Sequence, residues 1–321
     1  GYSGTDKVEL VEIGFTGITV TDLAFNARHE AVINANYYET LDNALENAQA
    51  GDKIVLLKDI NRDVAINKSI TLDGADKNYT GTMTLNAANI TVQNLNFVGG
   101  NIVKGNSTKN GANITIKGCD FDGQNAGDYA VNLRLTGAIV IEDCTAKDYG
   151  YGFLQVPKSN NTISVKNVEI SGVNYGFKID YSNNVVFEDV TITDTLYGIM
   201  DSNYGPKTYT IKNCNIDATN SLYLWERSAA KTDTFMFVGE NNFGTGTVTT
   251  SDYAILKLAD SDAVLKACEG LTVTSTNEIY SVVYEDGAYK VQKVAKVGEN
   301  HYYSLQEAID AANDGNIITL V

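Results

Sequence analysis

The stretch Ile163-Ser164-Val165-Lys166-Asn167-Val168-Glu169-Ile170 decides the fold of this chain of 321 residues. Apolar and polar residues alternate on both sides of Asn167, which is the two-residue period of a β-strand rather than the 3.6-residue period of a helix. The phrase returns about every 24 residues with Asn, Asp or Gly at its centre, at residues 70–74, 90–97, 114–121, 139–144, 185–192 and 209–216, and more weakly at 235–239. A fixed period of this length predicts a solenoid, because each unit buries its apolar face only against its neighbours.

A second strand signal follows several copies of the phrase, a Tyr-Gly pair before an apolar residue. It begins at Tyr151, Tyr175 and Tyr197, and Tyr129 starts a looser version. Val, Ile, Thr, Phe and Tyr dominate these segments, as they do in β-strands. Two or three short strands per repeat are typical of one coil of a parallel β-helix. We therefore expect an all-β solenoid of about eight or more coils, with a left-handed backbone tolerated at the repeated Asn, Asp or Gly.

Equivalent residues of successive coils are expected to stack as inward columns, about 4.8 Å apart. Three of the four cysteines fall in one column, where buried thiols act as small hydrophobic groups. A bridge between Cys119 and Cys144 on adjacent coils stays open, although parallel strands in register give poor disulfide geometry. The expected columns are Leu95, Cys119, Cys144, Val168, Val190 and Cys214; Phe97, Phe121, Ala146, Ile170, Ile192 and Ile216; and Val131, Phe153, Phe177 and Ile199.

A longer repeat frames the coils, because residues 31–57 match residues 295–321 at a constant offset. Each copy indicates a short amphipathic helix followed by a strand, with Thr40 and Ser304 as N-caps and Gly51 and Gly315 after the helix ends. We interpret the first helix, about residues 40–50, as a cap on the open end of the β-helix. The second copy stops at its first strand, so the chain is interpreted as a segment of a longer, modular protein.

The expected organisation has four parts. Residues 1–36 are interpreted as an N-terminal β element or linker, and residues 37–250 as the parallel β-helix with its capping helix. Residues 251–294 are interpreted as C-terminal strands, including a hairpin that turns at Asp286 and Gly287. Residues 295–321 are interpreted as the start of a second module.

The chain is acidic, with a net charge of −16 from 24 basic and 40 acidic side chains. This charge repels nucleic acid and anionic lipid at long range, so neither is an expected partner, and it disfavours polyanionic substrates such as pectate. No apolar run is long enough to cross a bilayer, so no membrane insertion is expected in this segment. The composition fits a solvated external surface.

The repeats, and the helix–strand phrase from Ser304 to Leu320, resemble the right-handed parallel β-helix regions of large surface proteins from gut and other anaerobic bacteria. These regions are pectate-lyase-like in fold, and the resemblance covers about residues 38–250. It implies export and attachment or display at the cell surface, so we expect an extracellular location. It supplies no catalytic residues, because lyases, hydrolases, tail spikes and adhesins share the architecture.

The sequence offers little catalytic machinery. The aspartate cluster, Gly-His-Gly phrase and Arg-x-Lys phrase of polygalacturonase-type enzymes are absent, and the two histidines lie outside the coils. No cofactor is expected, and calcium at the coil corners has no repeating ligand phrase to support it. The remaining candidate is a charged patch in which paired carboxylates act as acid and base on a sugar, although a solvated charged face is the simpler interpretation. The candidate residues are Lys178, Asp180, Asp201, Glu226 and Arg227, with Trp225 nearby.

Tyr151, Tyr175 and Tyr197 are expected to stack along one ridge of the solenoid. Their role is structural in the simplest interpretation, but exposed rings at coil spacing also offer a platform for sugar rings, to which Trp225 adds a fourth candidate. The sequence thus predicts a non-catalytic structural or adhesive module of a bacterial cell-surface or secreted protein, with weak binding to a polysaccharide or a host-cell glycan. The alternative is a polysaccharide lyase or glycoside hydrolase that acts through the charged patch.

Overall fold

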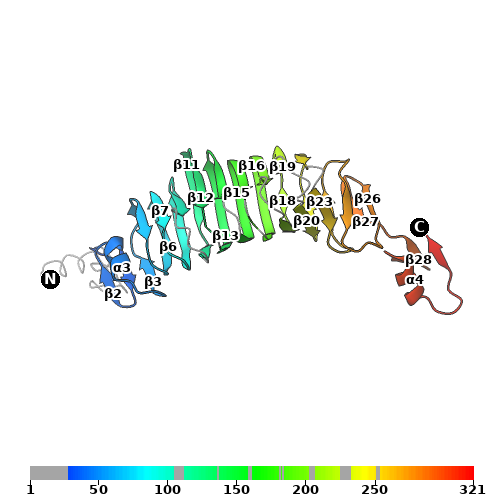
Figure 1. Cartoon of the computed structure of the whole chain (residues 1–321), viewed down its shortest axis with the longest axis horizontal. Coiled ribbons are helices and arrows are strands. Elements are labelled where there is room, and N and C mark those ends of the chain that lie inside the picture. Colours follow the sequence, from blue (N-terminus) through cyan, green and yellow to red (C-terminus); the bar gives the residue numbers. More distant parts are fainter. Residues whose placement is uncertain are drawn as a thin grey trace, which may run out of the picture.

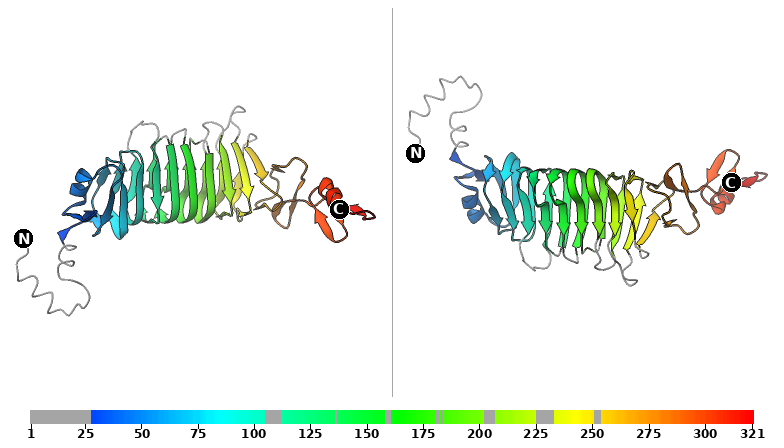
Figure 2. Two further views of the ribbon diagram at one scale, coloured as in Figure 1. Left: turned by 90° about the horizontal axis from the view of Figure 1, so that it is seen from below. Right: turned by 90° about the horizontal axis from the view of Figure 1, so that it is seen from above.

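The chain forms a rod of stacked coils (Figure 1). The computed structural model describes residues 28–104, 112–135, 137–157, 161–180, 182, 184–201, 207–224, 233–250 and 254–321. Strands of successive coils lie side by side and run in the same direction, as the two views in Figure 2 also show. The predicted parallel β-helix is confirmed, whereas the strands expected before residue 28 lie outside the described residues.

Each coil contributes to three faces. The first face is built from β3 (Lys53–Leu56), β6 (Thr71–Thr80), β8 (Ile90–Val98), β10 (Ile114–Lys117), β13 (Gly137–Tyr149), β15 (Asn161–Ile179), β16 (Asn184–Asp201), β17 (Thr208–Lys212), β20 (Asp233–Val238), β23 (Ala254–Leu258) and β25 (Val273–Ser275). The second face shares the long strands and adds β4 (Ile60–Asn61), β11 (Asp120–Ala126), β18 (Asn215–Ile216), β21 (Glu240–Asn242) and β24 (Val264–Lys266). The third adds β5 (Val64–Ile66), β7 (Thr82–Leu85), β9 (Asn101–Lys104), β12 (Tyr129–Leu133), β14 (Gly152–Val156), β19 (Asn220–Leu224) and β22 (Thr247–Thr249).

The register between coils confirms two of the expected interior columns and corrects the third. All members of the column from Leu95 to Cys214 are buried, and Phe97, Phe121 and Ala146 pair directly across neighbouring strands. In the third column Leu154, not Phe153, pairs with Phe177. The turn before β14 is one residue longer than the repeat suggests, because Tyr149 is buried in the interior and its hydroxyl donates to the Gly100 carbonyl (2.5 Å).

The corner between the first and second faces has a left-handed backbone, as predicted. Asn94, Gly118, Asp143, Asn167, Asp189, Asn213 and Gly239 have φ values between 50° and 62°. Residues with short polar side chains tolerate this conformation. Neighbouring corner residues also bond to one another, as when the Asn167 amide donates to the Asp143 carboxylate (2.9 Å). The first corner differs, because Ala75 and Asp76, rather than Gly74, have positive φ there.

The three cysteines of the predicted column are buried free thiols, as expected, and Cys268 is an exposed one. Cys119 and Cys144 contact each other on adjacent coils, and a hydrogen bond with Cys144 together with burial raises the pKa of Cys119 well above its usual value. A buried, protonated thiol reacts slowly, so these side chains act as packing groups.

Charged side chains on the outer surface of the first face pair across coils. Lys117 lies 3.1 Å from Glu142, and Glu188 lies 3.3 Å from Lys166 and 2.8 Å from Lys212. Opposite charges directly across neighbouring strands support the pairing register. This part of the charged surface is therefore neutralised within the chain.

The Asp73 carboxylate is bonded to four neighbouring residues. We therefore expect the stability of the fold to decrease in acid. Burial alone raises its pKa, but hydrogen bonds from Lys53, the Ala75 amide, Asn94 and Gln93 outweigh this and lower the pKa to about 2. A carboxyl whose pKa is lowered in the folded state stabilises the fold above its unfolded pKa, and this stability is lost as pH falls through the folded pKa.

We expect the free energy of unfolding to fall by about 2 kcal/mol from this group alone between about pH 5 and pH 2. Urea denaturation at successive pH values measures this fall. Asp73→Asn should flatten that part of the curve, whereas Asp76→Asn, at an exposed position, should leave it unchanged. Parallel curves for Asp73→Asn and the parent chain contradict the assignment.

Both ends of the rod are closed by antiparallel strands. At the N-terminal end, β1 (Ala31–Ile33) pairs with β2 (Asn36–Tyr38) and with β3. The capping helix α3 (Leu41–Asn47) begins at Thr40, whose hydroxyl accepts from the Asn43 amide. At the other end, parallel pairing continues to β25, and β27 (Ala288–Val291) then pairs antiparallel with β24. The hairpin between β26 (Val282–Glu285) and β27 is confirmed.

A small separate sheet follows the rod (Figure 1). It contains β28 (Ala295–Val297), β29 (Asn300–Tyr302) and β30 (Ile318–Leu320), with helix α4 (Leu305–Ala311) between the last two strands. The predicted N-cap of this helix is present, since the Ser304 hydroxyl accepts from the Glu307 amide.

Candidate functional site: a tyrosine row on the third face

Tyrosine side chains from consecutive coils meet on the third face. The pairing register aligns Tyr129 of β12 with Gly152 of β14, then with Tyr175 of β15 and Tyr197 of β16. The Tyr175 and Tyr197 rings stack with centroids 5.1 Å apart and planes 8° apart. The expected stacking of tyrosines on one ridge is therefore confirmed for these two residues.

Tyr151 joins the stack from a different position than predicted. Gly152, not Tyr151, occupies the register position of Tyr175. A side chain at Gly152 would collide with the Tyr175 carbonyl and the Tyr129 ring, so glycine leaves the space in which these rings face each other at 6.4 Å. The Tyr151 ring stacks on the Tyr129 ring with centroids 5.9 Å apart, and Tyr151 is 54% exposed.

Tyr223 of β19 extends the stack and was not predicted. Its ring meets Tyr197 edge to face at 5.3 Å. The alternation of Leu222, Tyr223 and Leu224 is the signal that places the tyrosine outward between two buried leucines. We call Tyr129, Tyr151, Tyr175, Tyr197 and Tyr223 the tyrosine row.

Two residues of the predicted charged patch lie beside the tyrosine row. The ammonium of Lys178 lies 5.5 Å from the centroid of the Tyr175 ring, which is within the range of a cation–π contact. Burial is the main reason that the pKa of Tyr129 is raised, and the charges of Tyr175 and then of Asp180 raise it further. The row therefore combines neutral aromatic rings and hydroxyls with one ammonium and one carboxylate.

Asp201 does not share this surface. It pairs with Ile179 and Leu224 in the pairing register and points into the interior, where it is fully buried. Its carboxylate forms an ion pair with the equally buried ammonium of Lys207. The backbone N–H of Lys207 donates to buried Asp233 (2.9 Å). The expectation that Asp201 lines one outer side with Lys178 is therefore corrected. The other candidates, Trp225, Glu226 and Arg227, lie outside the described residues.

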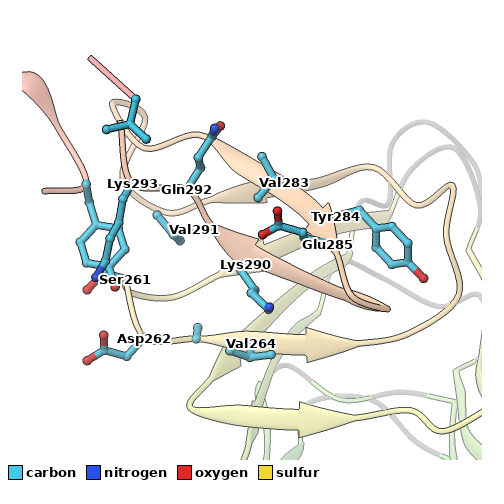
Figure 3. Close-up of a pocket in the computed structure, with 13 residues that line it drawn as sticks. Ser261, Asp262, Val264, Val283, Tyr284, Glu285, Lys290, Val291, Gln292 and Lys293 are labelled. Atoms are coloured by element: carbon cyan, nitrogen blue, oxygen red, sulfur yellow. The ribbon is translucent and has the colours of Figure 1, made fainter. Parts of the chain in front are cut away.

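A cavity lies away from the tyrosine row, at the C-terminal end of the rod. It has a volume of about 760 Å³ and is lined by the hairpin β26–β27, by residues 261–264 and 292–293, and by Tyr303 and Val321. Figure 3 shows Glu285 and Lys290 on the hairpin near Asp262 and Val264 of the adjoining segment. None of these side chains was predicted as part of a site.

Within the parts of the chain that the structure describes, no group of three or more His, Cys, Asp or Glu side chains is arranged to hold a metal ion. Neither of the two described helices is long and apolar enough to cross a bilayer.

A family model for the right-handed β-helix region matches residues 54–216, which is half of the chain. The chain belongs to the right-handed β-helix family. Comparison with the curated proteins and with the solved structures gave no match.

The match confirms the predicted fold and its handedness. In this right-handed β-helix, the matched residues include Tyr129, Tyr151, Tyr175 and Tyr197, so most of the tyrosine row lies on regular coils of the family fold. Because one fold carries many activities, the function must be argued from these surface residues.

Proposed function

We propose that this right-handed β-helix is a non-catalytic, rigid adhesive module of a bacterial cell-surface or secreted protein, and that its tyrosine row binds a glycan. The observation that carries this proposal is the continuous contact of five tyrosine rings across neighbouring coils. Aromatic rings offer broad apolar faces, and tyrosine adds a hydroxyl for hydrogen bonding. Sugar rings present matching apolar faces and hydroxyl groups.

The charge distribution supports a neutral glycan as the ligand. The net charge of −16 repels polyanionic chains at long range. Beside the row, Lys178 and Asp180 carry opposite charges. Neutral polysaccharides such as xylan, β-glucan or galactomannan are therefore the class that we expect to bind.

The placement of the carboxylates favours binding over cleavage. A glycosidase needs two carboxyl groups that flank the same sugar bond, about 5–10 Å apart. Of the predicted pair, Asp180 lies beside the tyrosine row, whereas Asp201 is buried and ion-paired with Lys207. The described residues of the predicted patch thus supply one accessible carboxylate rather than two.

Affinity measurements on tyrosine variants test the proposal. Tyr175→Ala and Tyr197→Ala should each raise the dissociation constant for the best neutral polysaccharide by about threefold to tenfold, since one ring contact contributes about 0.5–1.5 kcal/mol. Isothermal titration calorimetry or affinity electrophoresis measures this change. Tyr37→Ala provides the control, because Tyr37 is exposed but lies near the N-terminal cap.

Equal binding by all three variants would contradict the proposed role of the row. Preference for hyaluronate or polygalacturonate over the neutral chains would contradict the proposed ligand class.

A further inference from the structure

The C-terminal segment 295–321 repeats the fold of the N-terminal cap in detail. In both copies a strand pairs antiparallel with a second strand before the helix and with a third strand after it. The hydrogen bonds also recur with matching lengths. The matching pairs are Glu30 N–Tyr38 O (3.0 Å) with Val294 N–Tyr302 O (2.9 Å), Leu57 N–Glu30 O (2.8 Å) with Val321 N–Val294 O (2.9 Å), and Asp52 N–Gln49 O (3.1 Å) with Asn316 N–Asn313 O (2.9 Å).

The two copies differ in how far their apolar side chains are covered. Three large apolar side chains of the helix and final strand are buried in the first copy, whereas their equivalents in the second copy are exposed. The matching exposures are Leu41 0% and Leu305 45%, Leu45 9% and Ile309 47%, and Leu56 1% and Leu320 68%. We call the exposed residues Leu305, Ile309 and Leu320 the open cap face.

The first copy shows what covers such a face. The outer edge of β3 pairs in parallel with β6, so that Ile54 aligns with Leu72. Lys68 from the same coil donates to the Glu46 and Ala48 carbonyls at the end of α3 (2.5 and 2.8 Å). Within the described residues, β30 is one of the two edge strands of its sheet, whose order is β29–β28–β30. An apolar edge strand of this kind is a template for a further strand.

We propose that the open cap face is a docking surface for a coil of a second parallel β-helix, which lies against it as the coil that contains Lys68 and β6 lies against the first copy. The first strand of that coil pairs in parallel with β30, in the register by which β6 pairs with β3. Its apolar interior covers Leu305, Ile309 and Leu320. The expected partner is a β-helix coil in which apolar residues alternate with polar ones, so that one side of each strand is apolar.

Polar residues of the same C-terminal segment already contact the end of the preceding rod. The Tyr280 hydroxyl donates to Glu307 (2.6 Å), and the second oxygen of Glu307 accepts from the Tyr303 amide (3.0 Å). The Tyr280 and Tyr303 rings also lie 5.9 Å apart. Helix α4 thus contacts the end of one rod and leaves the open cap face free for the next. This arrangement makes the segment a joint between consecutive rods.

A cap exchange in the full chain tests the proposal. Residues 31–57 are replaced by a copy of residues 295–321, so that the second cap meets the first coil of the rod. We expect the exchanged chain to keep its β-sheet circular dichroism and its cooperative unfolding transition, whereas a chain lacking residues 31–57 should lose cooperativity in the first coils. An exchanged chain that behaves like the deletion overturns the proposal.

The substitution Leu320→Asp, made either in the transplanted cap or at its natural position, provides the matched control. Leu320→Asp in the transplanted cap should abolish the transition, because the leucine there takes the buried position of Leu56. The same substitution at its natural position should leave the transition unchanged, because Leu320 is exposed there. Equal effects in the two positions count against the proposal.

A tandem chain gives a second test that keeps the first rod intact. Residues 58–294 are joined after Val321, and amide hydrogen exchange is measured in α4 and β30. Exchange there should slow by about tenfold or more relative to the parent chain, because covered elements open less often. Unchanged exchange overturns the proposal. So does a dimer of the parent chain in which α4 and β30 become protected, since a second copy would then cover the face.

Discussion

Replacing Asp201 with leucine is expected to destabilise the rod by about 3–5 kcal/mol, because it leaves the ammonium of Lys207 buried without its ion-pair partner. Both side chains are fully buried and in direct contact. Leucine itself fits the site, since Asp201 lies between Ile179 and Leu224 in an interior column. The loss of stability is therefore expected to come from the buried ammonium that has lost its ion-pair partner, rather than from the shape of the new side chain. Chemical denaturation measures it.

The double variant separates these two causes. Asp201→Leu combined with Lys207→Met removes both charges and should recover most of the lost stability, because apolar replacements of a buried ion pair are often neutral or better. Asp180→Ala is the control, because it removes a carboxylate that is partly exposed rather than buried. It should lower the free energy of unfolding by less than about 1 kcal/mol. A double variant as unstable as Asp201→Leu alone would show that the pair is needed for a reason other than charge.

Phe121→Ala is expected to cost about 3–5 kcal/mol, because it opens a cavity in the middle of the rod. The Phe121 ring stacks on Phe97 with centroids 4.6 Å apart and meets Phe153 edge to face at 5.8 Å. In a solenoid each coil is stabilised by its neighbours, so a cavity here also weakens the contact between the two halves of the rod. Unfolding should broaden or divide into two steps.

Denaturation followed by circular dichroism and by tyrosine fluorescence tests this expectation. Tyr151→Ala is the matched control, because it removes a ring of similar size from an exposed position, and it should cost less than about 1 kcal/mol. A cost below 1 kcal/mol for Phe121→Ala would mean that the interior columns are not tightly packed.

The sequence was sufficient to predict the solenoid because its signal is repeated in every coil. The alternation around Asn167 and its counterparts predicted which side chains point inward and where the left-handed corners lie. The internal match between the two caps predicted both helices. Errors arose where one coil departs from the others. Burial of Tyr149 lengthens one turn, and this moves Gly152 into the position expected for Tyr151.

The candidate site was harder to predict. Strand alternation contained the information that Asp201 points inward, since it lies two residues after buried Ile199. A charged residue at an interior position is unusual, and its partner Lys207 follows in a segment with no repeat signal. The Tyr129 and Tyr175 rings can approach each other because Gly152, which has no side chain, lies between them. The position of Gly152 between these rings is known only from the register between coils.

Incubation of the chain with a panel of neutral polysaccharides tests the central claim most directly, when bound polysaccharide and newly formed chain ends are measured in the same sample. The claim predicts binding that weakens in Tyr175→Ala and Tyr197→Ala, with no increase in reducing ends or in unsaturated products that absorb ultraviolet light. New ends that disappear in Asp180→Ala or Asp201→Ala, with the variants still folded, would contradict it and establish a polysaccharide-cleaving enzyme.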